Sequence, residues 1–217
     1  MDIIKSIIVW LIGTCYVLVT FPLTLITLLL ALPFDRERII IHMFLMYQSK
    51  FFLYLIPIWK IRTEGRERAI KGNTYVIISN HQSILDILLM NSLRYQYKWI
   101  SKIENFNVPV IGWYLKMARY ITVDRGNDES KTEMLEKSFQ LALQANVSIL
   151  PVLIDGTRGI LPKHGMIFGS GHHIRIKVLD PIDPKDFGTD NPENLALKLS
   201  SLMTTALKEL RDEINLR

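Results

Sequence analysis

The stretch Thr74–Asp86, TYVIISNHQSILD, decides the fold. It begins with a short apolar run rich in β-branched residues, which is typical of a buried strand. The run stops at Asn80 and His81, and Ser83 followed three residues later by Asp86 is a helix-start pattern. We therefore predict a strand, a polar loop and a helix that begins near Ser83. Because ligand sites in open α/β sheets gather beyond the carboxyl ends of strands, the loop is a candidate functional site.

Strand-like and helix-like segments alternate along the chain after residue 59, which indicates an α/β layer fold. Helices are predicted to begin near Pro109, near Asn127 or Asp128, and near Pro192. Apolar residues recur at helical spacing in the last two and predict core-facing stripes, with Leu195, Leu199, Leu202, Ala206 and Leu210 on one face of the helix that begins near Pro192. Together with the strand over Thr74–Ser79, the predicted strands are Lys60–Glu64, Lys98–Ser101, Tyr120–Val123, Ser148–Ile154 and His173–Leu179.

The N-terminal region is strongly apolar. No charged side chain occurs from Ser6 to Phe34, and this run exceeds the roughly 20 residues that cross a bilayer core. The end of this run and the residues after it, LALPFDRER, offer a poor signal-peptide cleavage site. We therefore predict a hydrophobic helix that is retained as a membrane anchor.

A second apolar stretch runs from Ile39 to Trp59. It contains His42, Gln48 and Lys50, so it is less suited to crossing hydrocarbon alone. Two placements stay open: the stretch lies in the membrane interface, or it packs back on the first helix as a re-entrant hairpin. The predicted organisation is an anchor over residues 1–59 and a globular domain over residues 60–217.

The formal net charge is +5, and basic residues gather after the first apolar run. Lys and Arg are enriched on the cytoplasmic flanks of membrane helices, and anionic lipid attracts them. We therefore expect the globular domain on the cytoplasmic face, in contact with membrane lipid. No nucleic-acid partner is expected, because the sequence contains no basic platform interleaved with aromatic residues. The basic residues are Arg36, Arg38, Lys50, Lys60, Arg62, Arg66 and Arg68.

Neither a disulfide nor a metal site is predicted. Cys15 is the only cysteine and lies inside the predicted anchor, out of reach of nucleophilic chemistry in a soluble site. His172 and His173 are adjacent, which is not the spacing of a zinc-binding helix. The sequence leaves the oligomeric state open.

The pair formed by His81 and Asp86 has two interpretations. In the structural one, Ser83 and Asp86 form a capping box and the loop is ordinary. In the functional one, a histidine just before the helix meets an aspartate in its first turn. An aspartate that accepts a hydrogen bond from one ring nitrogen raises the basicity of the other. His81 is then a candidate general base, and Asp86 orients it.

The motif resembles the first motif of the glycerophospholipid acyltransferases, especially bacterial 1-acylglycerol-3-phosphate acyltransferases. That motif is Asn-His-x-x-x-x-Asp, matched by Asn80, His81 and Asp86, with Gln82 and Ser83 also usual. The resemblance continues in order through TEGRERA, WISKIENFNVPVIGWYLKMARYITVDRG and ILPVLIDGTRGILPK.

The resemblance implies an α/β fold with a mixed central sheet flanked by helices. It implies transfer of a fatty acyl chain from acyl-CoA or acyl-carrier protein to the free hydroxyl of 1-acylglycerol-3-phosphate (lysophosphatidate), which gives phosphatidate in phospholipid biosynthesis. By the resemblance His81 is the base and Asp86 its partner. The acyl donor is a co-substrate, and no cofactor or metal is implied.

Two cations correspond to the family's phosphate-binding residues. By resemblance Arg125 is the arginine of the second motif, and Lys102 approaches the same phosphate. Arg is suited to bidentate contact with phosphate. The alternatives are structural: Arg125 pairs with Asp124 or Asp128, and Lys102 is a helix-end lysine.

The family's third motif, a strand ending in Phe-Pro-Glu-Gly-Thr-Arg, has no clear counterpart. The sequence LIDGTRG, which contains Asp155 and Arg158, matches the family segment after that motif. Three interpretations stay open: Asp155 and Arg158 replace the missing acidic and basic groups, the site is impaired, or the segment is a simple turn, since Asp-Gly favours positive φ. The alternative functions are accordingly a catalytically impaired lipid-binding relative, an acyltransferase for another lysolipid, and a membrane-bound hydrolase.

Overall fold

The structure is a computed structural model that describes residues 2–57, 59–123, 131–161, 165–169, 171, 173–187 and 191–215. The chain forms two compact units, each assembled from three separate segments. The first unit comprises Met1–Trp59, Ile84–Asp128 and Lys163–Ser170. The second unit comprises Lys60–Ser83, Glu129–Pro162 and Gly171–Arg217.

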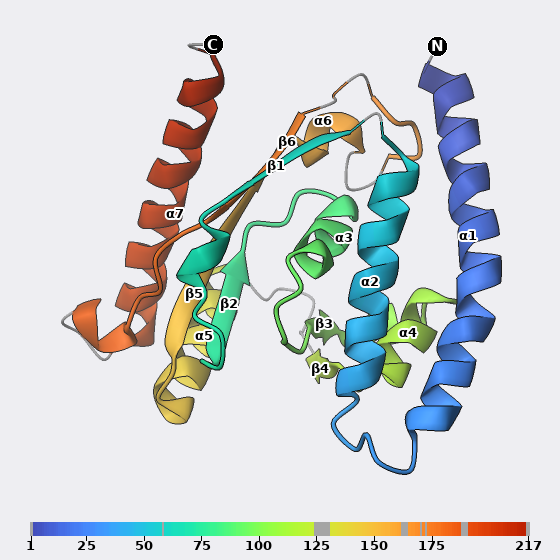
Figure 1. The fold of residues 1–217 in the computed structure, drawn as a ribbon. Coiled ribbons are helices and arrows are strands. Elements are labelled where there is room, and N and C mark those ends of the chain that lie inside the picture. The colour runs from blue at the N-terminus through green and yellow to red at the C-terminus, as the bar shows by residue number, and fades with distance from the viewer. Residues whose placement is uncertain are drawn as a thin grey trace. The chain divides into compact units, whose positions relative to one another are not determined.

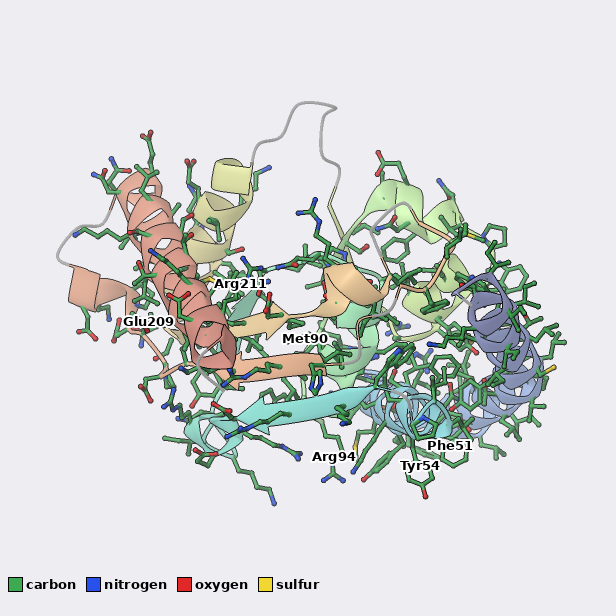
Figure 2. The ribbon with its side chains drawn as sticks, turned by 90° about the horizontal axis from the view of Figure 1, so that it is seen from above. Phe51, Tyr54, Met90, Arg94, Glu209 and Arg211 are labelled. Carbon is green, nitrogen blue, oxygen red and sulfur yellow. The ribbon has the colours of Figure 1, made fainter. Side chains whose placement is uncertain are left out.

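The first unit begins with two long apolar helices, α1 (Asp2–Ala31) and α2 (Ile39–Leu55), which pack side by side (Figure 1). Within the described residues, the span Ile3–Ala31 of α1 is long and apolar enough to cross a membrane. The chain therefore carries a candidate N-terminal membrane anchor. Phe51 and Tyr54 of α2 are exposed and project outward (Figure 2).

Polar contacts connect α1 and α2 within their apolar surfaces. The Gln48 side-chain amide donates a hydrogen bond to Thr24 Oγ1 at 2.8 Å. The Tyr16 hydroxyl donates to the backbone carbonyl of Gln48, also at 2.8 Å. Thr24 is fully buried between the helices. Hydrogen bonds of this kind add direction to the packing of apolar helices.

Asp35 sets the start of α2. Its carboxylate accepts hydrogen bonds from the backbone N–H groups of Ile39 at 2.9 Å and Ile40 at 2.8 Å. These donors belong to the first turn, where intrahelical acceptors are lacking. A negative charge here also interacts favourably with the helix dipole. The turn after α1 is therefore a capped connection between the two helices.

The rest of the first unit is built from short elements. α3 (Leu85–Ser92) packs on α2, and the strands β3 (Ile100–Lys102) and β4 (Ile121–Val123) form a parallel two-stranded sheet. η2 (Ile103–Asn107) and α4 (Ile111–Met117) connect the two strands. A buried cluster joins α2 to these elements and contains Ile41, Leu45, Phe106, Ala118 and Tyr120.

The second unit contains a four-stranded sheet in the order β1-β6-β5-β2. Its strands are β1 (Lys60–Glu64), β2 (Tyr75–Ser79), β5 (Ser148–Asp155) and β6 (His173–Val178). β1 pairs with β6 and β2 with β5 in parallel, whereas β5 and β6 are antiparallel. The predicted mixed sheet is thus confirmed. Short 3₁₀ and α-helical segments complete the connections: η1 (Arg66–Arg68), α6 (Thr157–Ile160) and η3 (Pro184–Phe187).

Two helices, α5 (Lys131–Ala145) and α7 (Pro192–Asn215), bury the apolar face of β2 and β5. Phe139 and Ala142 of α5 meet Leu195 and Leu199 of α7 in a core that is closed to solvent. The predicted stripe on α7 is wrong at one position. Leu202 is 38% exposed, and the neighbouring Met203 packs into the core instead.

Candidate active site

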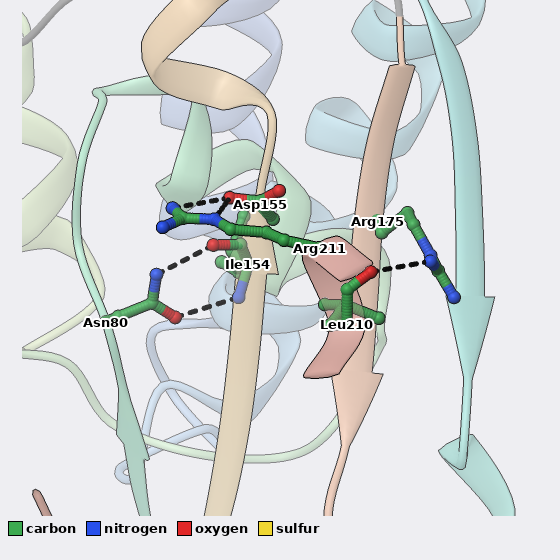
Figure 3. Close-up of polar contacts among 6 residues, drawn as sticks. All are labelled: Asn80, Ile154, Asp155, Arg175, Leu210 and Arg211. Atoms are coloured by element: carbon green, nitrogen blue, oxygen red, sulfur yellow. Dashed lines mark hydrogen bonds and ion pairs between the residues drawn. The ribbon is translucent and has the colours of Figure 1, made fainter. Parts of the chain in front are cut away.

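The loop after β2 is held in place by Asn80. The Asn80 side-chain amide donates to the Ile154 carbonyl at 2.7 Å, and Oδ1 accepts from the Ile154 backbone N–H at 2.8 Å (Figure 3). The last paired residues of the β2–β5 ladder are Ser79 and Val152. The carboxamide therefore continues the link between the strands beyond the end of β2. It fixes the backbone position from which His81 emerges.

His81 is exposed, whereas Ser83 is completely buried. The imidazole is therefore open to a small molecule, and the chain on its far side is anchored inside the protein. This arrangement is suited to a general base, because such a group must be accessible to its substrate and held in a defined position.

Asp86 lies in the first turn of α3 and is only 3% exposed. α3 begins at Leu85, and the side chain of Ile84, the residue before it, makes no cap hydrogen bond. Ser83 and Ile84 form a bend and a turn before the first helical residue, and Ile84 already has helical φ and ψ of −59° and −25°. Residue 83 ends a segment of the second unit and residue 84 begins one of the first, so the motif contributes residues to both.

The predicted phosphate-binding residues belong to the two-stranded sheet of the first unit. Lys102 is the last residue of β3 and pairs with Val123, the last residue of β4. Arg125 follows two positions later and lies outside the described residues, as does the side chain of Lys102. The backbone therefore brings Lys102 and Val123 to the same end of two adjacent strands.

Asp155 is the last residue of β5, and Arg158 lies beyond its carboxyl end on α6. Asp155 Oδ1 accepts hydrogen bonds from Arg211 of α7, at 2.9 Å from Nε and 2.8 Å from Nη2 (Figure 3). Arg158 is exposed on α6. Sequence reasoning missed Arg211, because no local pattern connects a residue of the last helix with a strand end.

The turn predicted at Asp155-Gly156 is present. Gly156 has φ of 90°, and a Cβ atom there would lie 2.0 Å from the carbonyl oxygen of His173. Only glycine fits both the conformation and the space. The residue thus fixes how the chain leaves β5 and enters α6.

No group of three or more His, Cys, Asp or Glu residues that could hold a metal occurs within the described part of the chain.

Three kinds of similarity to known proteins bear on the site. Residues 60–159 match the family model described as Acyltransferase. The chain also resembles the crystal structure of the 1-acyl-sn-glycerophosphate (LPA) acyltransferase PlsC from Thermotoga maritima, with a TM-score of 0.74 and 20% identity. That likeness covers 97% of this chain and 96% of the other, and it shows that both have the same α/β fold.

Curated relatives of the chain agree with the match to the Acyltransferase family model. The chain is 34% identical over 157 residues to the chloroplastic 1-acyl-sn-glycerol-3-phosphate acyltransferase BAT2 of Brassica napus, covering 67% of this chain and 44% of that protein. It is 36% identical over 106 residues to the chloroplastic 1-acyl-sn-glycerol-3-phosphate acyltransferase LPAT1 of Arabidopsis thaliana, covering 48% and 29%. The chain thus spans less than half the length of these two relatives.

The fold and the family model define an acyltransferase domain. With the curated relatives, they place the chain in the glycerophospholipid acyltransferase family.

Proposed function

We propose that the protein is a membrane-anchored acyltransferase that acylates 1-acylglycerol-3-phosphate to give phosphatidate. The observation that carries the proposal is the loop after β2. Asn80 fixes this loop to Ile154 through two hydrogen bonds, and it exposes His81 in a domain of the acyltransferase family. The names of the relatives support the choice of substrate, since BAT2 and LPAT1 are both named 1-acyl-sn-glycerol-3-phosphate acyltransferases.

In the proposed mechanism, His81 removes the proton from the free hydroxyl of the acceptor. The hydroxyl oxygen attacks the carbonyl carbon of the acyl thioester, the new C–O ester bond forms, and the C–S bond breaks. The departing sulfur takes up the proton from His81 and leaves as the thiol of CoA or of acyl-carrier protein. Asp86 accepts a hydrogen bond from the other ring nitrogen and holds the imidazole in the reactive tautomer. No further cofactor takes part in this scheme.

The acceptor phosphate is assigned to Lys102 and Arg125. Their support is the parallel pairing of β3 with β4, which ends at Lys102 and Val123. Cationic side chains suit a phosphate dianion, and a planar guanidinium can bind two oxygens at once.

Asp155 and Arg158 are proposed to serve the acceptor in place of the third motif. Arg158 is exposed on α6, and Asp155 forms an ion pair with Arg211. The same ion pair supports the competing hypothesis of an impaired lipid-binding relative. The Asp155 carboxylate is already engaged by Arg211, so in that hypothesis it serves a structural contact and not the substrate.

We assign residues 1–59 to membrane attachment and residues 60–217 to acyl transfer, with the catalytic part on the cytoplasmic face. The apolar span of α1 and the basic residues that follow it support this arrangement. Substrate and product are both lipids, so a site held at the membrane avoids extracting either into water.

The test uses the full chain purified in detergent, with lysophosphatidate and radiolabelled acyl-CoA or acyl-carrier protein. We expect wild-type transfer and a loss of about 10²- to 10⁴-fold in His81→Ala, the range of general base catalysis. An inactive wild type that still binds lysophosphatidate would make the protein a lipid-binding relative. Thioester loss without acylated lipid would make it a hydrolase.

A further inference from the structure

Asn91, near the end of α3, occupies a buried polar position in the first unit. It is 6% exposed. Its Nδ2 donates to Ser49 Oγ of α2 at 2.9 Å. Its Oδ1 accepts from the Tyr97 hydroxyl at 2.6 Å and from Trp99 Nε1 at 3.3 Å, two residues of the segment that leads into β3. One carboxamide therefore connects α3 with both α2 and β3.

The orientation of this carboxamide follows from its partners. A Trp indole N–H can only donate, so it must face Oδ1. The Ser49 hydroxyl already donates to the Leu45 carbonyl at 2.9 Å, so it meets Asn91 as an acceptor. The position thus needs an acceptor on one side and a donor on the other. Neither Asp nor Leu supplies both.

The contacts continue from Tyr97 to β4. The Tyr97 ring lies edge-on to the ring of His42, with 4.8 Å between centroids. His42 is fully buried in α2. Its Nε2 donates to the Tyr95 carbonyl at 3.3 Å, and its Nδ1 accepts from the Tyr120 hydroxyl at 2.7 Å. Tyr120 directly precedes β4. We call the side chains of His42, Ser49, Asn91, Tyr97, Trp99 and Tyr120 the polar cluster.

The polar cluster restricts the position and rotation of α3, which apolar packing alone does not determine. α3 has only eight residues, and its buried apolar side chains, Leu85, Leu89 and Met90, make contacts without direction. Such contacts permit small shifts along or about the helix axis. The hydrogen bonds of Asn91 restrict both, because their donors and acceptors are fixed in direction.

Residues of the proposed reaction stand on the elements that the polar cluster connects. Asp86 is five residues from Asn91, which corresponds to about 7.5 Å along the helix. Lys102 ends the strand that follows Tyr97 and Trp99, and Val123 ends the strand that follows Tyr120. A shift of about 1 Å in a catalytic group can cost about 10²-fold in rate.

We propose that Asn91 is a positioning residue of the acyl transfer: its carboxamide fixes α3, and with it Asp86, relative to the strand that carries Lys102. This inference rests on the proposed function. It assigns Asn91 no contact with substrate.

The first experiment compares Tyr97→Phe with Tyr16→Phe. Both changes delete one tyrosine hydroxyl of the first unit that donates a hydrogen bond, to Asn91 Oδ1 and to the Gln48 carbonyl respectively. Only the first connects α3 with β3. We expect kcat to fall about 10-fold in Tyr97→Phe, with KM for both substrates within about twofold, and Tyr16→Phe to stay within about twofold of wild type. Equal kcat values for the two variants would overturn the proposal.

The second experiment separates positioning from a general structural role. If Asn91 acts through Asp86, then Tyr97→Phe will slow wild type but will not further slow Asp86→Asn in single-turnover assays. A structural role predicts instead that the two losses multiply. Multiplied losses would contradict the inference, and non-additive losses would support it.

A third measurement needs no turnover. We expect Tyr97→Phe to increase hydrogen exchange in α3 and β3 together, and Tyr16→Phe to leave both unchanged. If wild type is as inactive as His81→Ala, the proposed function fails, and this exchange result alone decides whether Asn91 couples α3 to β3. Unchanged exchange in Tyr97→Phe would end the inference independently of catalysis.

Discussion

The two units hold their functional residues by different means. In the second unit, a four-stranded sheet supplies the framework, the core beneath it is apolar, and Asn80 extends the framework by bonding to the backbone of Ile154. In the first unit, short elements pack on α2, and the carboxamide of Asn91 bonds to the side chains of Ser49, Tyr97 and Trp99. In a sheet, the backbone hydrogen bonds already fix how the strands are oriented, so the core beneath can be apolar. Elements of only a few residues lack such a ladder, and hydrogen bonds between polar side chains fix their orientation instead.

The largest effect is expected from removing apolar volume in the second unit. Phe139 is fully buried between α5 and α7. Phe139→Ala should lower the free energy of unfolding by about 3–5 kcal/mol, through lost burial and the cavity left behind. Denaturant unfolding in detergent measures it, with the exposed Leu141→Ala as the control. If both variants lose the same stability, the apolar core does not dominate this unit.

The next effect tests the framework at Asn80. Asn80→Asp keeps an acceptor for the Ile154 N–H but places a carboxylate against the Ile154 carbonyl, where the amide now donates. We expect a loss of about 1–3 kcal/mol in unfolding free energy, since a buried acceptor loses its donor.

The same variant should transfer acyl chains at least about 10-fold more slowly, because the backbone that carries His81 is held less precisely at the end of β2. Thermal unfolding and the acyl-transfer assay check the two parts separately. A fully active Asn80→Asp protein would show that activity does not depend on the two hydrogen bonds between Asn80 and Ile154.

A pH effect is expected in the first unit. Burial lowers the pKa of His42, and the nearby charge of Lys98 lowers it further, while the Tyr95 carbonyl acts in the opposite direction. Tyr97 and Tyr120, which also face the ring, remain neutral because burial raises the pKa of each. The unfolded chain therefore binds the extra proton more readily. The free energy of unfolding should fall as the pH decreases through about 6.5, the value for an unperturbed histidine.

His42→Gln should flatten this dependence between about pH 7 and pH 5. Chemical unfolding at a series of pH values measures both proteins. An identical slope in the variant would assign the pH dependence to another group.

The smallest effect concerns the contact between α1 and α2. Gln48→Leu removes the hydrogen bond to Thr24, and such bonds between membrane helices contribute about 0.6 kcal/mol on average. Combining it with Thr24→Val in a double-mutant cycle isolates the pair. A coupling energy near zero would mean that apolar contact alone joins the helices.

The sequence predicted the framework far better than the polar cluster. Each of the six predicted strands corresponds to an observed strand, because β-branched runs between turn residues carry a local signal. β3 begins at Ile100 and not at Lys98, because its pairing with β4 begins at Ile100 and Ile121. The start of the helix predicted near Asn127 or Asp128 lies outside the described residues.

The residues that sequence reasoning missed depend on distant partners. Asn91 reads as an ordinary polar residue within LLMNSLRY, and only the fold reveals Ser49 and Tyr97 beside it. Arg211 likewise looks like a solvated position on α7 until Asp155 is placed next to it. The family motif identified Asn80, but the reason for an asparagine there became clear only from its two bonds to Ile154.

The interleaving of the two units has a consequence for synthesis and for protein engineering. The chain crosses between them at residues 59/60, 83/84, 128/129, 162/163 and 170/171. His42 precedes its partner Tyr120 by 78 residues, so α2 leaves the ribosome well before this neighbour is synthesised. For the same reason, cutting the chain at residue 59 to obtain a water-soluble fragment would remove Ser49, one of the partners of Asn91, and His42, the partner of Tyr120. Detergent or nanodisc preparations of the intact chain are the better starting material.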